Sequence, residues 1–161
     1  MTGNSSRLVG GDFWIRAFLW DGSAMRDLGT LGGIFSNGSA INDKGQVTGS
    51  ASTADAAEQH AFYGTALAMQ DLGTLGGTLG DGVAINAIGA RDGLGQTAGD
   101  ADSTPSCGTA LAMQDLGTLG GTSSHGVAIN DKGQVTGSAS TADDAAARLP
   151  SGTAARCRTL N

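Results

Sequence analysis

Two histidines and a regularly spaced set of aspartates are the side chains in this sequence that could perform chemistry. A serine hydrolase needs a serine, a histidine and an acid brought together, and a glycosidase needs two paired carboxylates. His60 and His125 fall at different points of a 44-residue periodicity, so they are not copies of one ligand. Asp27, Asp71 and Asp115 recur at that step, which favours a structural role. We therefore predict no catalytic, cofactor-binding or metal-binding residues, and we interpret His60 as a half-buried structural histidine in a strand.

Two kinds of short polar sequence are candidates for binding loops. Asn42–Gly45 and Asn130–Gly133 both read Asn-Asp-Lys-Gly, which suits a tight turn between strands. They lack the alternating acids and the distal glutamate of an EF-hand loop. Leu72–Gly77 is glycine-rich, but neither Gly-Lys-Ser/Thr nor a helix pattern follows it, so it does not match a phosphate-binding loop. We interpret it as the crossing between repeat units, where glycine permits close backbone approach.

The elements that must position these residues form a repeat. The sequence DLGTLGG occurs at Asp27–Gly33, Asp71–Gly77 and Asp115–Gly121, and its flanking sequences keep the same step. Self-similarity of this kind is typical of architectures in which each unit buries its apolar face on its neighbours. Short β-prone runs separated by Gly, Asn and Asp turns fill each copy, without the apolar period of a helix.

These features predict an all-β fold. Four strands in a repeat of this length match a propeller blade, so we expect an incomplete β-propeller-like array of about three four-stranded blades, with a β-solenoid as the alternative. The Ser39–Leu72 copy should form the best-defined antiparallel unit. The predicted core positions are Ile41, Val47, Phe62, Leu72, Leu75, Ile85, Leu116 and Ile129.

The repeat also divides the chain. Residues 1–15 form an atypical N-terminal segment and 16–37 a partial repeat, followed by an intact repeat over 38–81. The next repeat, 82–125, is broken in its middle at 87–107, and the last, 126–161, is broken from about residue 145. Because both broken stretches lack strand alternation and contain proline, we expect them to be irregular, and exposed or poorly ordered.

Composition excludes several classes of protein. A net charge of −6, a calculated isoelectric point near 4.5 and the absence of a Lys/Arg cluster argue against a nucleic-acid-binding surface. No run of apolar residues is long enough for a membrane-spanning helix, and the first residues lack the apolar core of a signal peptide. Cys107 and Cys157 are too few for a disulfide framework and lack metal-ligand spacing.

The repeated sequences resemble the HAF repeat family, named after the tripeptide that occurs here at His60–Phe62. Arg16–Gly33 matches the first part of the family pattern, with Arg16 in place of its histidine, and Ala40–Val47 and Ala128–Val135 match the second. The resemblance implies a probable extracellular or surface repeat protein of bacteria. The family has no assigned catalytic residues, so none carries over to this sequence.

The genetic code suggests how the broken stretches arose. Codons for Ser103–Ser106 can spell Gln-His-Ala-Phe in a neighbouring frame, the sequence found at Gln59–Phe62. Codons for Cys157–Leu160 can likewise spell Met-Gln-Asp-Leu, as at Met69–Leu72, and those for 146–150 can again contain Gln-His-Ala-Phe. All three lie at or within one residue of the positions that the repeat step predicts. We hypothesise that small insertions and deletions shifted the reading frame, with ordinary divergence as the alternative.

Three functions remain open from the sequence. The first is a non-catalytic extracellular or surface repeat module that interacts with an unknown protein or glycan and needs no cofactor. The second is a non-functional fragment or frameshifted remnant of a longer HAF-repeat protein. The third, least favoured because the turns of the intact copies are rich in Gly, Ser, Thr and Ala, is a propeller hydrolase or lyase. Exposed strand edges are also expected to allow self-association.

Overall fold

The computed structural model describes residues 1–161 except 56, 101–102, 110–111, 143–145, 149–154 and 157–161. The described residues form β-strands joined by turns, and their one helical element is the 3₁₀ turn η1 (Ala98–Asp100). The strands are β1 (Thr2–Val9), β2 (Asp12–Trp20), β3 (Met25–Asp27), β4 (Gly32–Ile41), β5 (Val47–Thr53), β6 (Gln59–Gly64), β7 (Met69–Gly73), β8 (Gly76–Ile85), β9 (Arg91–Thr97), β10 (Ser103–Thr109), β11 (Ala112–Asp115), β12 (Gly120–Ile129), β13 (Gln134–Thr141), β14 (Ala146–Arg148) and β15 (Ala155–Arg156).

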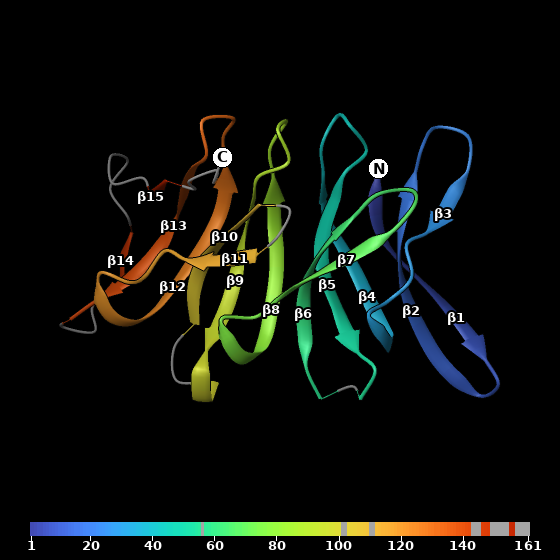
Figure 1. The fold of residues 1–161 in the computed structure, drawn as a ribbon, viewed down its shortest axis with the longest axis horizontal. Helices are drawn as coiled ribbons and strands as arrows, with labels where there is room; N and C mark the ends of the chain where they lie inside the picture. Colours follow the sequence, from blue (N-terminus) through green and yellow to red (C-terminus); the bar gives the residue numbers. More distant parts are fainter. Residues whose placement is uncertain (56, 101–102, 110–111, 143–145, 149–154, 157–161) are drawn as a thin grey trace.

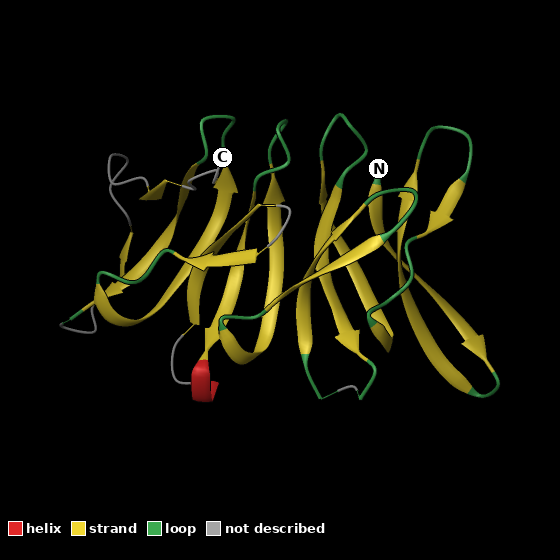
Figure 2. Cartoon of the chain, viewed as in Figure 1, coloured by secondary structure: helices red, strands yellow, loops and turns green. Residues whose placement is uncertain are grey.

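The strands form one open sheet. Its order is β1-β2-β4-β5-β6-β8-β9-β10-β12-β13-β14, while β3, β7, β11 and β15 pair with β2, β6, β10 and β13 respectively. Figure 1 shows the strands crossing the view in chain order, from β1 and β2 at one end to β13 and β14 at the other, and Figure 2 shows how completely strand dominates. The predicted all-β, repeat-like fold is therefore confirmed, and in the described residues the sheet does not close into a ring.

The repeating unit is a four-stranded antiparallel meander. β4 to β7 pair in sequence, and β8 to β11 repeat the arrangement. Gly32 pairs with Thr53 in the first of these units and Gly76 with Thr97 in the second, a displacement of one repeat step. The best-defined unit was predicted over Ser39–Leu72. The structure confirms its four strands but begins the first of them earlier, at Gly32.

Successive units are joined by single parallel bridges between the third strand of one unit and the first strand of the next. These bridges connect Ile15 to Phe35, Gln59 to Leu79 and Ser103 to Ser123. Each first strand also packs on the second strand of the unit before it, because glycine lies at the contact. A Cβ atom at Gly82 would overlap Thr48 Oγ1, and one at Gly126 would overlap Asp92 Oδ1. The units consequently sit closely side by side.

The core is small and made of short side chains. Phe62 and Val47 are fully buried and pack with Ala17, Leu19, Leu28 and Ala51. Of the predicted core positions, Val47, Phe62 and Leu72 are buried. The other five, Ile41, Leu75, Ile85, Leu116 and Ile129, are half-buried. Ile41 packs on the cluster around Phe62, and Leu116 and Ile129 pack on a second cluster around Ala90 and Cys107.

The N-terminal segment contributes a regular strand. β1 pairs with β2 without a register shift: Thr2 faces Leu19 at one end of the pairing and Val9 faces Asp12 at the other. Gly10 and Gly11, both at positive φ, form the turn between the two strands. β1 therefore holds the position in its unit that β5 holds in the next one. In the described residues, no strand corresponding to β4 precedes it.

The prediction that residues 87–107 are irregular and exposed is wrong. They contain β9 and most of β10, which pair in the same register as β5 and β6 after one repeat step. The stretch keeps the length of the copy it replaces, so β8 and β12 offer ladder partners on both sides, and backbone hydrogen bonds do not depend on side-chain identity. Even Pro105 lies in a strand, where its carbonyl accepts a hydrogen bond from the Leu116 amide. Cys107 is buried there and disulfide-bonded.

The prediction that the chain is irregular from about residue 145 is wrong at residues 146–148 and 155–156. β14 and β15 both pair with β13, so Arg148, Ala155 and Arg156 lie in short strands. The remaining residues of 149–161 lie outside the described part of the chain. In the part that is described, no helix is long and apolar enough to cross a membrane.

Candidate functional site

The turns that begin at Asn42, Asn86 and Asn130, between the first two strands of successive units, all lie at one end of the sheet (Figure 1). In the first turn, Asn42 Oδ1 accepts hydrogen bonds from the backbone amides of Lys44, at 3.0 Å, and Gln46, at 3.1 Å. Gly45 has a φ of 71°, the left-handed conformation that glycine adopts without strain. Asn130 closes its turn through the same contacts. The predicted tight turns are confirmed.

Two of the asparagine side chains also link the repeats, a role that the sequence does not predict. Asn42 Nδ2 donates to the backbone carbonyl of Asn86 at 2.9 Å, and Asn86 Nδ2 donates to that of Asn130 at 2.9 Å. Asn42 and Asn86 therefore each serve two turns, because the oxygen closes the residue's own turn and the nitrogen binds the next turn, whereas Asn130 Nδ2 donates to Gln134 in its own turn. We call this row the Asn ladder (Asn42, Asn86 and Asn130). The recurrence of Ala-Ile-Asn at the repeat step was its signal in the sequence.

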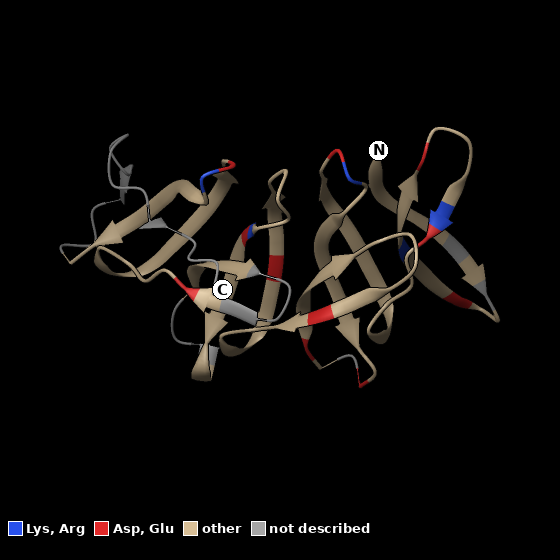
Figure 3. Ribbon diagram, turned by 45° about the horizontal axis from the view of Figure 1, so that its top comes forward, with Lys and Arg blue, Asp and Glu red and all other residues tan. Residues whose placement is uncertain are grey.

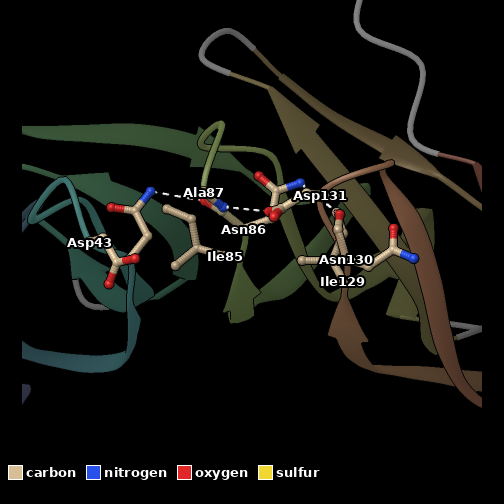
Figure 4. Close-up of a pocket in the computed structure, with 8 residues that line it drawn as sticks. Asp43, Ile85, Asn86, Ala87, Ile129, Asn130 and Asp131 are labelled. Carbon is tan, nitrogen blue, oxygen red and sulfur yellow. Dashed lines mark hydrogen bonds between the residues drawn. The ribbon is translucent and has the colours of Figure 1, made fainter.

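A shallow groove of about 370 Å³ runs beside the Asn ladder (Figure 4). Residues from three successive repeats line it, and they occupy equivalent positions: Asn42, Asp43, Ile85, Asn86, Ala87, Ile129, Asn130 and Asp131. The tips of the first and third turns carry acidic and basic residues next to each other (Figure 3). A concave site built by the same position of consecutive repeats suits an extended ligand.

The groove offers hydrogen-bond acceptors. Asp43 and Asp131 are exposed, and Asp131 Oδ1 accepts the Ala87 backbone amide at 2.9 Å, leaving its other oxygen for a ligand. Ala87 stands where the flanking repeats have aspartate. Carboxylates accept hydrogen bonds from hydroxyl, ammonium or guanidinium groups, and Ile85 and Ile129 add apolar surface. Among the described residues, no group of three His, Cys, Asp or Glu side chains is placed to hold a metal ion.

His60 lies between two carboxylates on the face of β6. Its Nδ1 is 2.9 Å from both carboxylate oxygens of Asp71, and its Nε2 is 2.8 Å from Glu58 Oε2. Burial lowers the pKa of His60, but the hydrogen bonds to Glu58 and Asp71 outweigh it and the pKa is raised overall. The half-buried position predicted for His60 is confirmed.

The contact between His60 and Asp71 also recurs along the chain. In the preceding repeat the equivalent residues are Arg16 and Asp27, at 3.8 Å, which indicates a cation–carboxylate pair that ties the third strand to the fourth. In the following repeat the cation is replaced by Thr104, which is buried and whose Oγ1 has no hydrogen-bond partner within the described residues. His125, in β12, lies at another point of the repeat, as expected.

The repeated aspartates hold the crossings between units. Asp27, Asp71 and Asp115 each accept a hydrogen bond at 2.7 Å from the backbone amide two residues later. This is the local turn closure that aspartate performs readily. The structural role predicted for these residues, and the placement of DLGTLGG between units, are confirmed.

A group of buried charges was missed in the sequence. Arg91 and Asp92 are only 2% and 1% exposed, and they replace Val47 and Thr48 of the preceding repeat. The Arg91 guanidinium stacks on the Tyr63 ring, 4.3 Å from its centroid, but its Nε and Nη1 and both Asp92 oxygens have no hydrogen-bond partner among the described residues. Burial lowers the pKa of Arg91 to about 10, raises that of Asp92 to about 7, and raises that of Asp81 in the neighbouring strand. Aligning the repeats shows from the sequence that Arg91 and Asp92 replace Val47 and Thr48, but it does not show that the two charged side chains are buried.

The Asn ladder provides a first testable result. Asn86→Asp should destabilise the fold by about 1–3 kcal/mol, because Asn86 is 5% exposed and a carboxylate there cannot donate to the Asn130 carbonyl. Asn130→Asp is the matched control, since the described donor contact of Asn130 Nδ2 is within its own turn, to Gln134. Urea unfolding of both variants measures the difference. Equal losses would contradict a role in joining the repeats.

The chain was also compared with known proteins. No protein-family model matches it, and no curated protein and no solved structure is significantly similar.

Proposed function

We propose that the chain is a non-catalytic repeat module that binds an extended partner, a glycan or a protein segment, in the groove beside the Asn ladder. The observation that carries this proposal is the composition of the groove, which takes the same position from three successive repeats. A repeating surface matches a repeating or elongated ligand, because each unit adds an equivalent contact. The acceptor-rich walls favour a partner that supplies hydroxyl or cationic donors.

The residues with catalytic potential support binding rather than chemistry. Both nitrogens of His60 are held by carboxylates, that of Glu58 just before β6 and that of Asp71 in β7, in the place where the preceding repeat has an Arg–Asp pair. A residue that substitutes for a structural arginine is better explained by strand pairing than by acid–base catalysis. A propeller hydrolase or lyase is therefore the least supported of the functions considered.

We further propose an extracellular or cell-surface location. This rests on the resemblance of DLGTLGG, His60–Phe62 and Ala40–Val47 to the HAF repeats. Detection of the protein in the medium or on intact cells of its source, by an antibody against the folded chain, tests the location independently of any ligand.

The binding proposal predicts that the double variant Asp43→Ala/Asp131→Ala binds its partner with a dissociation constant raised about tenfold or more. Two charge-assisted hydrogen bonds are lost in this variant. Calorimetric titration with neutral oligosaccharides and with lysine-rich peptides separates the two classes of partner. Asp12→Ala is the control, because Asp12 is exposed on β2, away from the groove. Ala87→Asp should strengthen binding, since it supplies the missing carboxylate. If neither class binds, or if the double variant binds as the parent does, the groove is not the site.

A second candidate, a frameshifted remnant without function, is favoured by the buried side-chain atoms of Arg91, Asp92 and Thr104 that have no hydrogen-bond partner in the part of the chain that the structure describes. All three replace residues that are well accommodated in the intact repeat, namely Val47, Thr48 and His60. Selection removes buried unpaired charges readily because they cost stability. The gene's nucleotide sequence tests this: a frameshift origin requires codons 102–106 to spell Gln-His-Ala-Phe in a neighbouring frame.

A further inference from the structure

The outer edge of β1 is long, regular and unpaired among the described residues. β1 has eight residues, pairs only with β2, and shows no bulge along the whole pairing. β4 does contact β1, but through side chains, since Asn4 Nδ2 donates to Asn37 Oδ1 and Thr2 lies against Gly38. The outer backbone groups of β1 are not used by these contacts.

The hydrogen-bond pattern identifies which groups face outward. Met1 and Trp20 exchange both backbone hydrogen bonds, at 3.1 and 2.8 Å. In an antiparallel pair the facing residues alternate between hydrogen-bonded and non-hydrogen-bonded positions. The odd-numbered residues of β1 therefore bond to β2, and Thr2, Asn4, Ser6 and Leu8 direct their amides and carbonyls away from the sheet.

This edge lacks the features by which proteins block strand addition. Bulges, prolines, lysines and very short length prevent edge-to-edge pairing, and β1 has none of these. Its sequence, TGNSSRLV, holds a single charged residue. Leu8 is 69% exposed and faces Phe13, which is also exposed, across the hairpin. The edge is thus chemically suited to another β-strand.

We propose that β1 pairs with β1 of a second copy of this chain, antiparallel and about a twofold axis at Ser5. In this register Thr2 faces Leu8 of the other copy and Asn4 faces Ser6, so all four outward residues of each strand form ladder hydrogen bonds. Among the registers that place outward residues opposite outward residues, it is the one that uses all four of them. Arg7 then faces Gly3 rather than the other Arg7, so no like charges oppose each other. The two open sheets become one continuous sheet across the dimer.

Ser6→Pro tests the pairing, because it removes an outward amide that the β1–β2 ladder does not use. We expect the chain to be a dimer by sedimentation equilibrium, and Ser6→Pro to raise the dissociation constant by about tenfold or more. Ser6→Thr, which retains the amide, should dimerise like the parent. A monomeric parent chain, or a Ser6→Pro variant that dimerises as well as the parent, would overturn the proposal.

Cysteine crosslinking tests the register without relying on proline. Ser5 should face Ser5 of the other copy at a non-hydrogen-bonded position, where the Cα atoms are close enough for a disulfide. Ser5→Cys should therefore form a covalent dimer under mild oxidation, whereas Ser6→Cys, which faces Asn4, should not. Peptide mapping must place the crosslink between the two introduced cysteines. Equal crosslinking of both variants, or none in Ser5→Cys, would rule out this register even if Ser6→Pro fails to fold.

Discussion

Replacing Gly49 with alanine is expected to destabilise the protein by about 3 kcal/mol or more, the upper range for inserting a methyl group where no space exists. A Cβ atom at Gly49 would overlap the backbone carbonyl oxygen of Asn37 in the paired strand. A backbone atom cannot rotate away as a side chain can, so β4 and β5 would have to separate. The same overlap recurs at Gly93 with Asp81 and at Gly137 with His125. Strand pairing in the units that begin with β4, β8 and β12 therefore depends on this glycine.

Gly45→Ala is the matched comparison for that effect. A methyl group added at Gly45 would meet no other heavy atom within 4 Å, and its only difficulty is a φ of 71°. The cost there should be about 1–2 kcal/mol, that of a left-handed alanine. Urea unfolding of both variants gives the two free energies. A loss at Gly49 no larger than the loss at Gly45 would show that close strand approach is not required.

The opposite result, a large gain in stability, is expected when Arg91 and Asp92 are replaced by valine and threonine. These are the residues at the equivalent positions, Val47 and Thr48, in the preceding unit, where both are fully buried. The double variant removes two buried ionisable groups, of which Arg91 Nε and Nη1 and both Asp92 oxygens have no hydrogen-bond partner within the described part of the chain. It also restores the threonine whose hydroxyl bonds to the carbonyl of the neighbouring strand, as Thr48 does with Phe62 at 3.0 Å.

The gain should depend on pH in a defined direction. Burial raises the pKa of Asp92 from 3.8 to about 7, so between these values the folded protein binds more protons than the unfolded chain. The stability of the parent protein therefore falls as pH rises from about 4 to about 7, by up to about 4 kcal/mol for a shift of this size. The advantage of Asp92→Thr should grow over the same window. Asp81, whose pKa is also raised, leaves a residual slope of the same sign in the variant.

Thermal or urea unfolding of the parent and the variants at pH 4 and pH 8 measures this effect. Asp12→Thr, the same substitution at an exposed position of β2, is the matched control. The single variants separate the two contributions, since Arg91 also stacks on Tyr63 and loses that contact when replaced. An Asp92→Thr advantage that is equal at both pH values would show that the carboxyl group is not desolvated.

The sequence alone determined the features that depend on local chemistry. The repeat step follows from the recurrence of DLGTLGG, and the all-β character follows from short β-prone runs between turn residues. The turn at Asn42–Gly45 and the turn closures at Asp27, Asp71 and Asp115 follow from residue types only a few positions apart. In each case a side chain bonds to a backbone amide two to four residues away. Such contacts form wherever the sequence occurs, so a repeated sequence predicts a repeated structure.

The tertiary structure decided what depends on contacts between repeats. Residues 91–97 and 103–109 form strands because β8 and β12 provide ladder partners, although Arg91, Asp92 and Thr104 bury polar atoms that have no hydrogen-bond partner among the described residues. Backbone pairing prevails there over side-chain pattern, and as a consequence Arg91 and Asp92 are buried. The Asn ladder and its groove likewise require two turns from different repeats to lie within hydrogen-bond distance, and only the packing of successive units, through glycines such as Gly82, sets that distance.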